Sequence, residues 1–213
     1  MKDLLTNISD SLQTGDYEDI AGLVQKALDS GLEPKTILND GLLHGMSVIG
    51  KQFANHDVFL PDVLMAAKAM HAGLDVLKPL LSGEDTGIIG TVVIGTVKGD
   101  LHDIGKNLVS IMLHGAGFEI VDLGKDVPAE TFVDAAIKHN ASIIGLSALL
   151  TTTMPEMKKV IAMVHERGLS DKIRVIVGGA PVSETFATEI GADGYAHDAA
   201  RAVTLVKQLA EVH

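Results

Sequence analysis

Apolar side chains recur every three or four positions through the first 80 residues, the spacing of one face of an α-helix. Pro34 and Pro61 stand at the expected starts of two of these segments, where a missing backbone N–H costs no hydrogen bond. The helices are predicted over residues 4–12, 20–28, 37–53 and 60–79. The N-terminal part of the chain is therefore expected to form a four-helix bundle.

The pattern changes after the polar stretch at residues 82–87, where short β-branched runs begin to alternate with helical segments. The runs are too apolar for a half-exposed sheet, so the alternation predicts a parallel sheet covered by helices on both faces. The strands are predicted over residues 88–94, 119–123, 142–146 and 173–177 and around Tyr195, and the helices over residues 105–116, 129–139, 155–167, 183–190 and 198–212.

These elements predict an α/β fold, in which a helical cap precedes a Rossmann-like, flavodoxin-like doubly wound sheet of five parallel strands. The domain boundary is expected at residue 85, which gives domains over residues 1–85 and 86–213. Ligands of such sheets bind beyond the carboxyl ends of the strands, near the point where the strand order reverses. The loops after residues 94, 147 and 177 are therefore the places to look for function.

Composition narrows the possible functions. The 213 residues include 17 Lys and Arg against 28 Asp and Glu, a net charge of −11, which argues against nucleic acid or an anionic membrane as a partner. The chain has no cysteine, so disulfides, thiolate zinc sites, iron–sulfur clusters and cysteine nucleophiles are excluded. The N-terminus lacks a signal-peptide pattern and the apolar runs are too short to span a bilayer, so a cytoplasmic location is expected.

The loop after the first predicted strand carries charged residues between two glycines, Gly99 and Gly105. A phosphate-binding loop is one interpretation, but the glycine spacing is one residue too long and Asn107 replaces the magnesium-binding hydroxyl. A better interpretation is that His102 is a metal ligand and that the Asp100 carboxylate orients it. One histidine is too few for a bare metal ion, which would need further ligands, whereas a metal held by a macrocycle needs only one axial ligand.

Three short motifs in the second part of the chain stand at specific spacings. Asp100-x-His102-x-x-Gly105 is followed after 41 residues by Ser147-x-Leu149, and after another 28 residues by Gly178-Gly179. This arrangement resembles the signature of cobalamin-binding domains in methyltransferases and mutases, over about residues 86–213. The N-terminal helices and residues 58–62, Val-Phe-Leu-Pro-Asp, are similar to the cap of small corrinoid proteins in methanol, methylamine, betaine and aryl-ether methyltransferase systems.

The resemblance implies a cobalamin cofactor whose cobalt is bound from below by His102, the implied metal ligand. Asp100 would hydrogen-bond the other imidazole nitrogen of His102, and Ser147 would extend this network, so the three are the implied catalytic residues. Gly105, Gly178 and Gly179 would make room for the nucleotide tail. The implied cofactor-binding residues outside the cap are Gly99, Asp100, Leu101, His102, Asp103, Ile104, Gly105, Ser147, Leu149, Thr151, Gly178, Gly179, Tyr195, Ala196 and Ala199.

The cap would shield the upper face of the cobalt from water and oxygen. Its apolar residues would have to move aside for methyl transfer, with residues 82–87 as the hinge. A plain core role is the alternative, because a bundle helix needs an apolar stripe in any case. The candidates for the cap contact are Phe59, Leu60, Val63, Leu64, Met65 and Met70.

By this resemblance the chain is expected to be a methyl carrier that cycles between cob(I)alamin and methylcob(III)alamin. A substrate-specific methyltransferase would load the methyl group, and a second methyltransferase would pass it to tetrahydrofolate or a thiol cofactor. A reductive activation protein is a further expected partner. The alternatives are the small subunit of an adenosylcobalamin mutase, a cobalamin-dependent sensor and a flavodoxin-like nucleotide binder.

Overall fold

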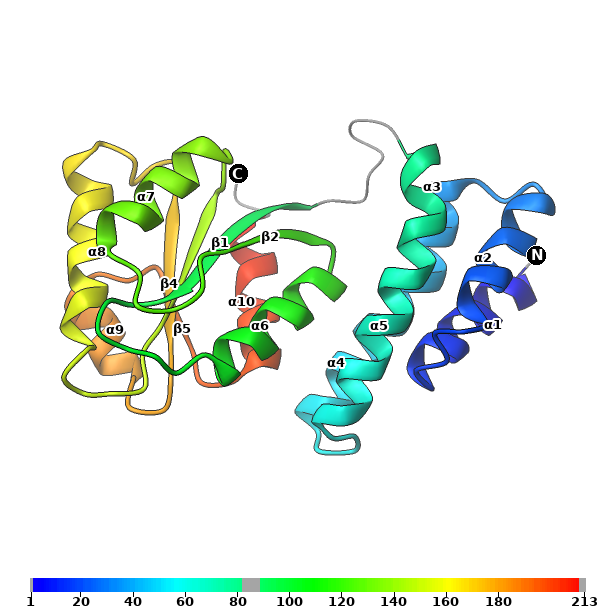
Figure 1. The fold of residues 1–213 in the computed structure, drawn as a ribbon, viewed down its shortest axis with the longest axis horizontal. Helices are drawn as coiled ribbons and strands as arrows, with labels where there is room; N and C mark the ends of the chain where they lie inside the picture. The colour runs from blue at the N-terminus through cyan, green and yellow to red at the C-terminus, as the bar shows by residue number, and fades with distance from the viewer. Residues whose placement is uncertain (1, 82–88, 211–213) are drawn as a thin grey trace. The chain divides into compact units, whose positions relative to one another are not determined.

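The computed structural model describes residues 2–81 and 89–210, which divide into two compact units. The helical unit comprises the first range, with Gly115–Gly117 grouped with it, and the sheet unit comprises the rest of the second range (Figure 1). The boundary expected at residue 85 lies outside the described residues, so it stays a prediction.

The helical unit contains the four expected helices, with short additions. Its elements are α1 (Lys2–Gln13), α2 (Ile20–Asp29), α3 (Pro34–Thr36), η1 (Ile37–Leu43), α4 (His44–Ala54), α5 (Leu60–Leu77) and η2 (Lys78–Leu80). The predicted third helix runs through α3, η1 and α4, and its η1 segment is a π-helix, which a period of 3.6 residues does not anticipate. Helix α1 packs against η1 and α4, and small residues permit this approach, since a Cβ atom at Gly45 would lie 2.9 Å from the Ser9 carbonyl oxygen.

The sheet unit alternates strands and helices as predicted. Its elements are β1 (Gly90–Thr96), α6 (Ile104–Gly115), β2 (Phe118–Asp122), α7 (Ala129–Lys138), β3 (Ile143–Ser147), α8 (Pro155–Glu166), β4 (Arg174–Gly178), α9 (Glu184–Ile190), β5 (Gly194–Ala196) and α10 (Ala199–Ala210). All strands are parallel, in the order β2-β1-β3-β4-β5. Helices α6 and α10 cover one face of the sheet, and α7, α8 and α9 cover the other (Figure 1). The predicted doubly wound sheet is confirmed.

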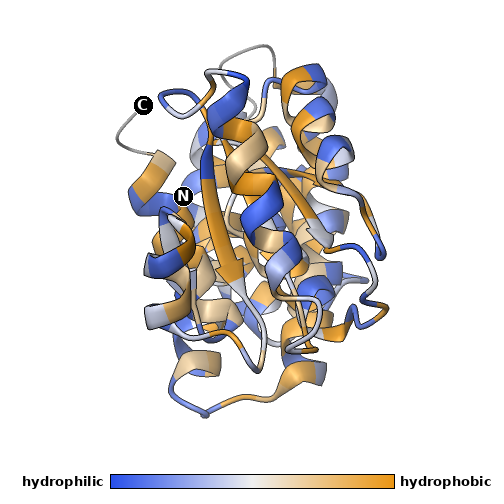
Figure 2. Ribbon diagram, turned by 90° about the vertical axis from the view of Figure 1, so that its left-hand side faces the viewer, coloured by the Kyte–Doolittle hydropathy of each residue, from blue (hydrophilic) through white to orange (hydrophobic). Residues whose placement is uncertain are grey.

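The core of this unit lies between the sheet and the α7–α8–α9 layer, where apolar strands meet the apolar sides of the helices (Figure 2). Phe132 of α7 is fully buried there, and its ring passes directly over Gly95 of β1. A Cβ atom at Gly95 would lie 2.8 Å from that ring, so glycine allows this close approach of helix to sheet. Across the described ranges, no helix combines the length and the apolar character needed to span a membrane.

Candidate functional site

The candidate site lies at the carboxyl ends of β1 and β3, neighbouring strands at which the strand order reverses. The connection after β1 carries Asp100 and His102, and the connection after β3 carries residues 148–154. Thr96 and Ser147, the last residues of the two strands, are in register. The sheet therefore brings two of the three sequence motifs to one place.

Asp100 is fully buried and is the centre of a hydrogen-bond network. Its Oδ1 accepts from the ring Nδ1 of His102 at 2.7 Å and from the His102 backbone amide at 3.1 Å. Its Oδ2 accepts from the backbone amides of Leu149 at 2.7 Å and Leu150 at 3.1 Å, and from the Thr153 hydroxyl at 2.7 Å. One carboxylate thus joins the β1–α6 connection to the β3–α8 connection.

This network also sets the charge of Asp100. Burial alone would raise the pKa of the carboxyl group, because it disfavours the charged form. Hydrogen bonds from the Leu149 amide, the Thr153 hydroxyl and His102 favour the carboxylate more strongly, and they hold the pKa of Asp100 well below its ordinary value. Asp100 is therefore a carboxylate at neutral pH and can act only as an acceptor.

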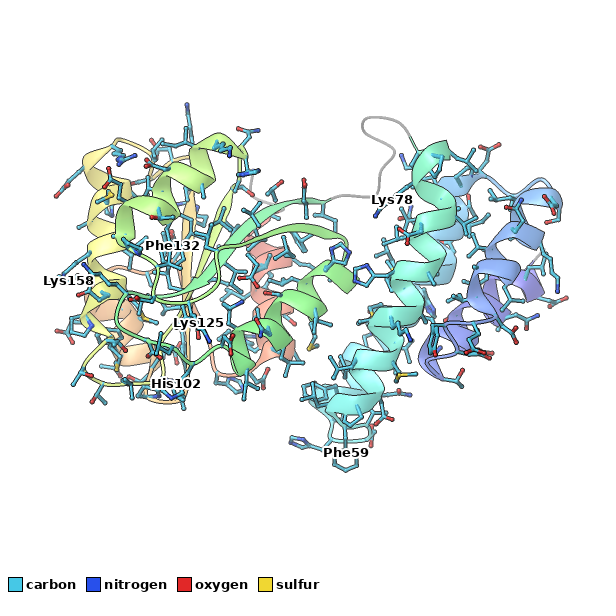
Figure 3. All side chains as sticks on the ribbon, in the orientation of Figure 1. Phe59, Lys78, His102, Lys125, Phe132 and Lys158 are labelled. Carbon is cyan, nitrogen blue, oxygen red and sulfur yellow. The ribbon has the colours of Figure 1, made fainter. Side chains whose placement is uncertain are left out.

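The ionised carboxylate determines the tautomer of His102. Because Asp100 only accepts, Nδ1 of the imidazole must carry the proton, which leaves the lone pair of the neutral ring on Nε2. The buried hydroxyl of Thr96 donates to the His102 carbonyl at 2.8 Å and fixes the backbone as well. The His102 side chain, labelled in Figure 3, follows the carboxyl end of β1 and is 51% exposed, so Asp100 holds the imidazole at Nδ1 while the ring stays open to solvent.

Ser147 was expected to extend the hydrogen-bond network of Asp100 and His102, and the structure differs from this expectation. The Ser147 hydroxyl makes no hydrogen bond to Asp100 within residues 89–210, and its backbone carbonyl accepts from the Val97 amide. Ser147 is still within β3, whereas the residues that reach Asp100 belong to the turn that follows it. Thr153 makes the contact to Asp100 that was expected of Ser147, and nothing in the Thr-Thr-Thr stretch at residues 151–153 marks the third hydroxyl as the one that is buried.

The glycines of the motifs, Gly105, Gly178 and Gly179, are explained by different features of the structure. A Cβ atom at Gly105 would meet nothing within 4 Å, which leaves open space beside the first turn of α6. At Gly179, where φ is +133°, a Cβ atom would lie 1.9 Å from the Ala148 carbonyl oxygen, and at Gly178 it would lie 2.9 Å from the Ala196 carbonyl oxygen. The double glycine is therefore required by the packing of the backbone itself, before any ligand is considered.

Both connections at the site carry exposed apolar side chains. Leu101 and Ile104 flank it after β1, and Leu149 and Leu150 follow β3, all four well exposed to solvent. No group of three His, Asp or Glu residues suited to a bare metal ion occurs within the described ranges. One outward imidazole with apolar neighbours and open space at Gly105 fits a metal held by a large organic ring.

The position of Lys106 contradicts the interpretation of this loop as a phosphate-binding loop. Its side chain is buried, forms an ion pair with Asp122 at the end of β2, and donates to Asn107 Oδ1 at 2.6 Å. This ammonium group is therefore engaged within the protein, whereas a phosphate-loop lysine must reach a nucleotide. Asp103 lies at the rim, where its carboxylate is 4.0 Å from Lys125.

The remaining predicted contacts of the sheet unit lie along its carboxyl edge. Gly99 and Thr151 are exposed in the two site connections. Ala196 and Ala199 are buried, and Tyr195 is partly buried against the core. Whether these residues contact a cofactor tail stays a prediction.

The six predicted cap residues fall into two groups within the helical unit. Val63 and Met70 are buried in the core of the bundle, as the plain alternative expects. Phe59, Leu60, Leu64 and Met65 are exposed at the start of α5, and Phe59 is at the turn before that helix (Figure 3). Four of the six can therefore contact another molecule without rearrangement of the bundle.

Comparison with known families assigns both units. Two models described as "B12 binding domain" match residues 90–204 and 4–78. The chain is 45% identical over 209 residues to the dimethylamine corrinoid protein of Methanosarcina barkeri, with 98% of each chain covered. It is 41% identical over 208 residues to trimethylamine corrinoid protein 1 of Methanosarcina acetivorans, covering 97% of this chain and 96% of the relative.

Solved structures agree. The methanol:cobalamin methyltransferase complex MtaBC of Methanosarcina barkeri contains a chain with 34% identity and a TM-score of 0.89, and the match covers 99% of this chain and 81% of that one. A cobalamin-binding protein of Desulfitobacterium hafniense has 31% identity and a TM-score of 0.79, with 96% and 98% of the two chains covered. Fold and motif thus agree over nearly the whole chain.

Proposed function

The chain belongs to the family of B12-binding corrinoid proteins, and from this premise we propose that it carries a methyl group between two methyltransferases. One partner would transfer the group from a substrate to the bound cofactor, and the other would transfer it onward to tetrahydrofolate or a thiol. The observation that carries the proposal is the fully buried Asp100 carboxylate, which holds His102 with Nε2 directed away from it. When bound, the corrinoid supplies a cobalt that accepts and releases a methyl group.

The protein's own residues then have separate tasks. His102 would hold the cobalt through its Nε2, and Asp100 would keep the imidazole in the tautomer that leaves this nitrogen unprotonated. Thr153 and the Leu149 and Leu150 amides would keep Asp100 ionised and in place. Leu101 and Ile104 would cover apolar surface of the ring. No other general base is needed, because the chain's part is to bind, orient and shield the cofactor.

The names of the relatives suggest which methyl donors to test first. The most similar proteins given above are a dimethylamine and a trimethylamine corrinoid protein, and one solved relative comes from a methanol system. We propose a methylated amine as the donor class. Donor choice would reside in the partner methyltransferase, since this chain's site offers a metal ligand and apolar surface.

Methyl loading tests this proposal. The protein would be reconstituted with hydroxocobalamin, reduced, and mixed separately with dimethylamine, trimethylamine and methanol methyltransferases and their ¹⁴C-methyl substrates. We expect protein-bound label with an amine partner, and loss of that label when a second methyltransferase and its acceptor are added. His102→Ala is the matched control. A protein that retains the cofactor but takes label from none of the three partners would contradict the methyl-carrier function. Omission of a reductive activation protein would test whether that further proposed partner is required.

A further inference from the structure

A second loop supports the loop that carries Asp100 and His102. The connection between β2 and α7, residues 123–128, runs beside the end of β1 and is joined to it by backbone hydrogen bonds. The Thr96 amide donates to the Gly124 carbonyl at 2.9 Å, the Val127 amide donates to the Thr96 carbonyl at 3.0 Å, and Val97 and Val127 form a parallel bridge. The β2–α7 connection is thus attached to the site from the side opposite β3.

Asp126 makes the contacts that reach the ligand loop itself. Its Oδ1 accepts a hydrogen bond from the Gly99 amide at 2.7 Å. Its own backbone amide donates to the Asp100 carbonyl at 3.0 Å. The side chain and the backbone of one residue therefore hold two peptide groups of this loop, the one before Gly99 and the one after Asp100, close to His102.

The backbone of Asp126 is in an uncommon conformation. Its φ is +57°, a left-handed value that costs free energy for any residue with a Cβ atom, though aspartate and asparagine tolerate it best. In the described ranges, three residues other than glycine have such a value: His56, Asp126 and Asn140. The His56 and Asn140 amides bond to carbonyls at the ends of the preceding helices, as helix termini commonly do. At Asp126 the conformation instead directs the amide and the carboxylate at the site.

We propose that Asp126 is a positioning residue for the His102 ligand. By holding the Gly99 amide and the Asp100 carbonyl, it fixes the backbone from which the Asp100 carboxylate reaches residues 149–153 on one side and His102 Nδ1 on the other. The Asp100 side chain can then keep all its hydrogen bonds without displacing the imidazole. This role deepens the proposed function and rests on it only for its use in catalysis, because the contacts are within the protein chain.

Three variants separate the side chain from the backbone conformation. Asp126→Gly relieves the left-handed strain and removes the acceptor, so the variant should fold. Asp126→Asn keeps an acceptor oxygen and tolerates the same φ. Asn140→Gly makes the same backbone change at φ +51°, at the end of α7, where no contact to the site loop exists.

The first readout needs no cofactor. Amide hydrogen exchange of Gly99, measured by NMR on the cofactor-free protein, should be about tenfold or more faster in Asp126→Gly, because a hydrogen bond to a charged acceptor is lost. Exchange should stay within about threefold of the parent in Asp126→Asn and in Asn140→Gly.

The second readout reports the ligand. In protein that carries ¹⁵N-labelled histidine and is loaded with reduced, paramagnetic cobalamin, electron paramagnetic resonance shows a two-line nitrogen splitting when a histidine is coordinated, whereas the cofactor's own benzimidazole nitrogen gives three lines. The share of molecules with this splitting should fall in Asp126→Gly and not in the other two variants. Unchanged Gly99 exchange in Asp126→Gly, or faster exchange with full coordination, would overturn the positioning role. Absence of the splitting in the parent protein would instead count against the proposed function.

Discussion

Replacement of Thr153 by valine removes one hydrogen bond from a buried carboxylate while nearly conserving side-chain shape. The Thr153 hydroxyl donates to Asp100 Oδ2 at 2.7 Å, and both residues are buried, so water cannot replace the lost donor without rearrangement. A hydrogen bond to a charged group contributes about 1.5–3 kcal/mol. The Leu149 and Leu150 amides remain on the same oxygen. We therefore expect the sheet unit to lose about 2 kcal/mol of unfolding free energy.

Urea unfolding of the cofactor-free protein measures this loss. The chain has two tyrosines and no tryptophan, with Tyr17 in the helical unit and Tyr195 in the sheet unit, so a Tyr17→Phe background lets tyrosine fluorescence report the sheet unit alone. Thr153→Ser should retain most of the stability. Ser147→Ala should cost less than about 0.5 kcal/mol, because that hydroxyl makes no hydrogen bond in the described residues. Equal losses for Ser147→Ala and Thr153→Val would refute the assignment of Thr153 to the network.

Asp100 should make stability pH-dependent: its pKa is lowered in the folded protein and ordinary, about 3.9, in the unfolded chain. Its contribution to the free energy of unfolding is therefore complete above about pH 5 and is lost as pH falls. In urea titrations, the free energy of unfolding of Asp100→Asn should fall less steeply with decreasing pH than that of the parent protein. An unchanged slope would count against the network. Gly179→Ala should prevent folding or cost more than about 3 kcal/mol, since its Cβ would meet the Ala148 carbonyl, and a stable variant in thermal melts would contradict this. Gly105→Ala should fold normally yet bind hydroxocobalamin more weakly in equilibrium dialysis, and unchanged affinity would show that the cofactor does not use this space.

The fold was largely predictable because its signals are local. A switch from helical spacing to short β-branched runs marks the second unit, and every predicted strand there is found within two residues of its place. The π-helical turn of η1 was not predictable, because its buried apolar residues, Ile37, Leu38 and Leu42, do not by themselves distinguish a π-helix from an α-helix.

The part of the site whose residues are close together in the sequence was predictable. Asp100 and His102 are two residues apart, so their hydrogen bond follows from local geometry and a known spacing. Thr153 is 53 residues from Asp100, and the Leu149 and Leu150 donors are backbone amides that carry no side-chain signal. Similarly, Asp126 acts through a left-handed conformation that only the folded chain reveals.

The most direct test of the account is the axial ligand. Protein that carries ¹⁵N-labelled histidine and is reconstituted with hydroxocobalamin would be compared with His102→Ala by visible absorption and, after reduction, by electron paramagnetic resonance. We expect a corrinoid that co-elutes with the protein and shows the two-line ¹⁵N-histidine splitting, and a loss of that splitting in His102→Ala. The same ¹⁵N splitting in both proteins would contradict the proposed function, because the imidazole held by Asp100 would then not be the ligand.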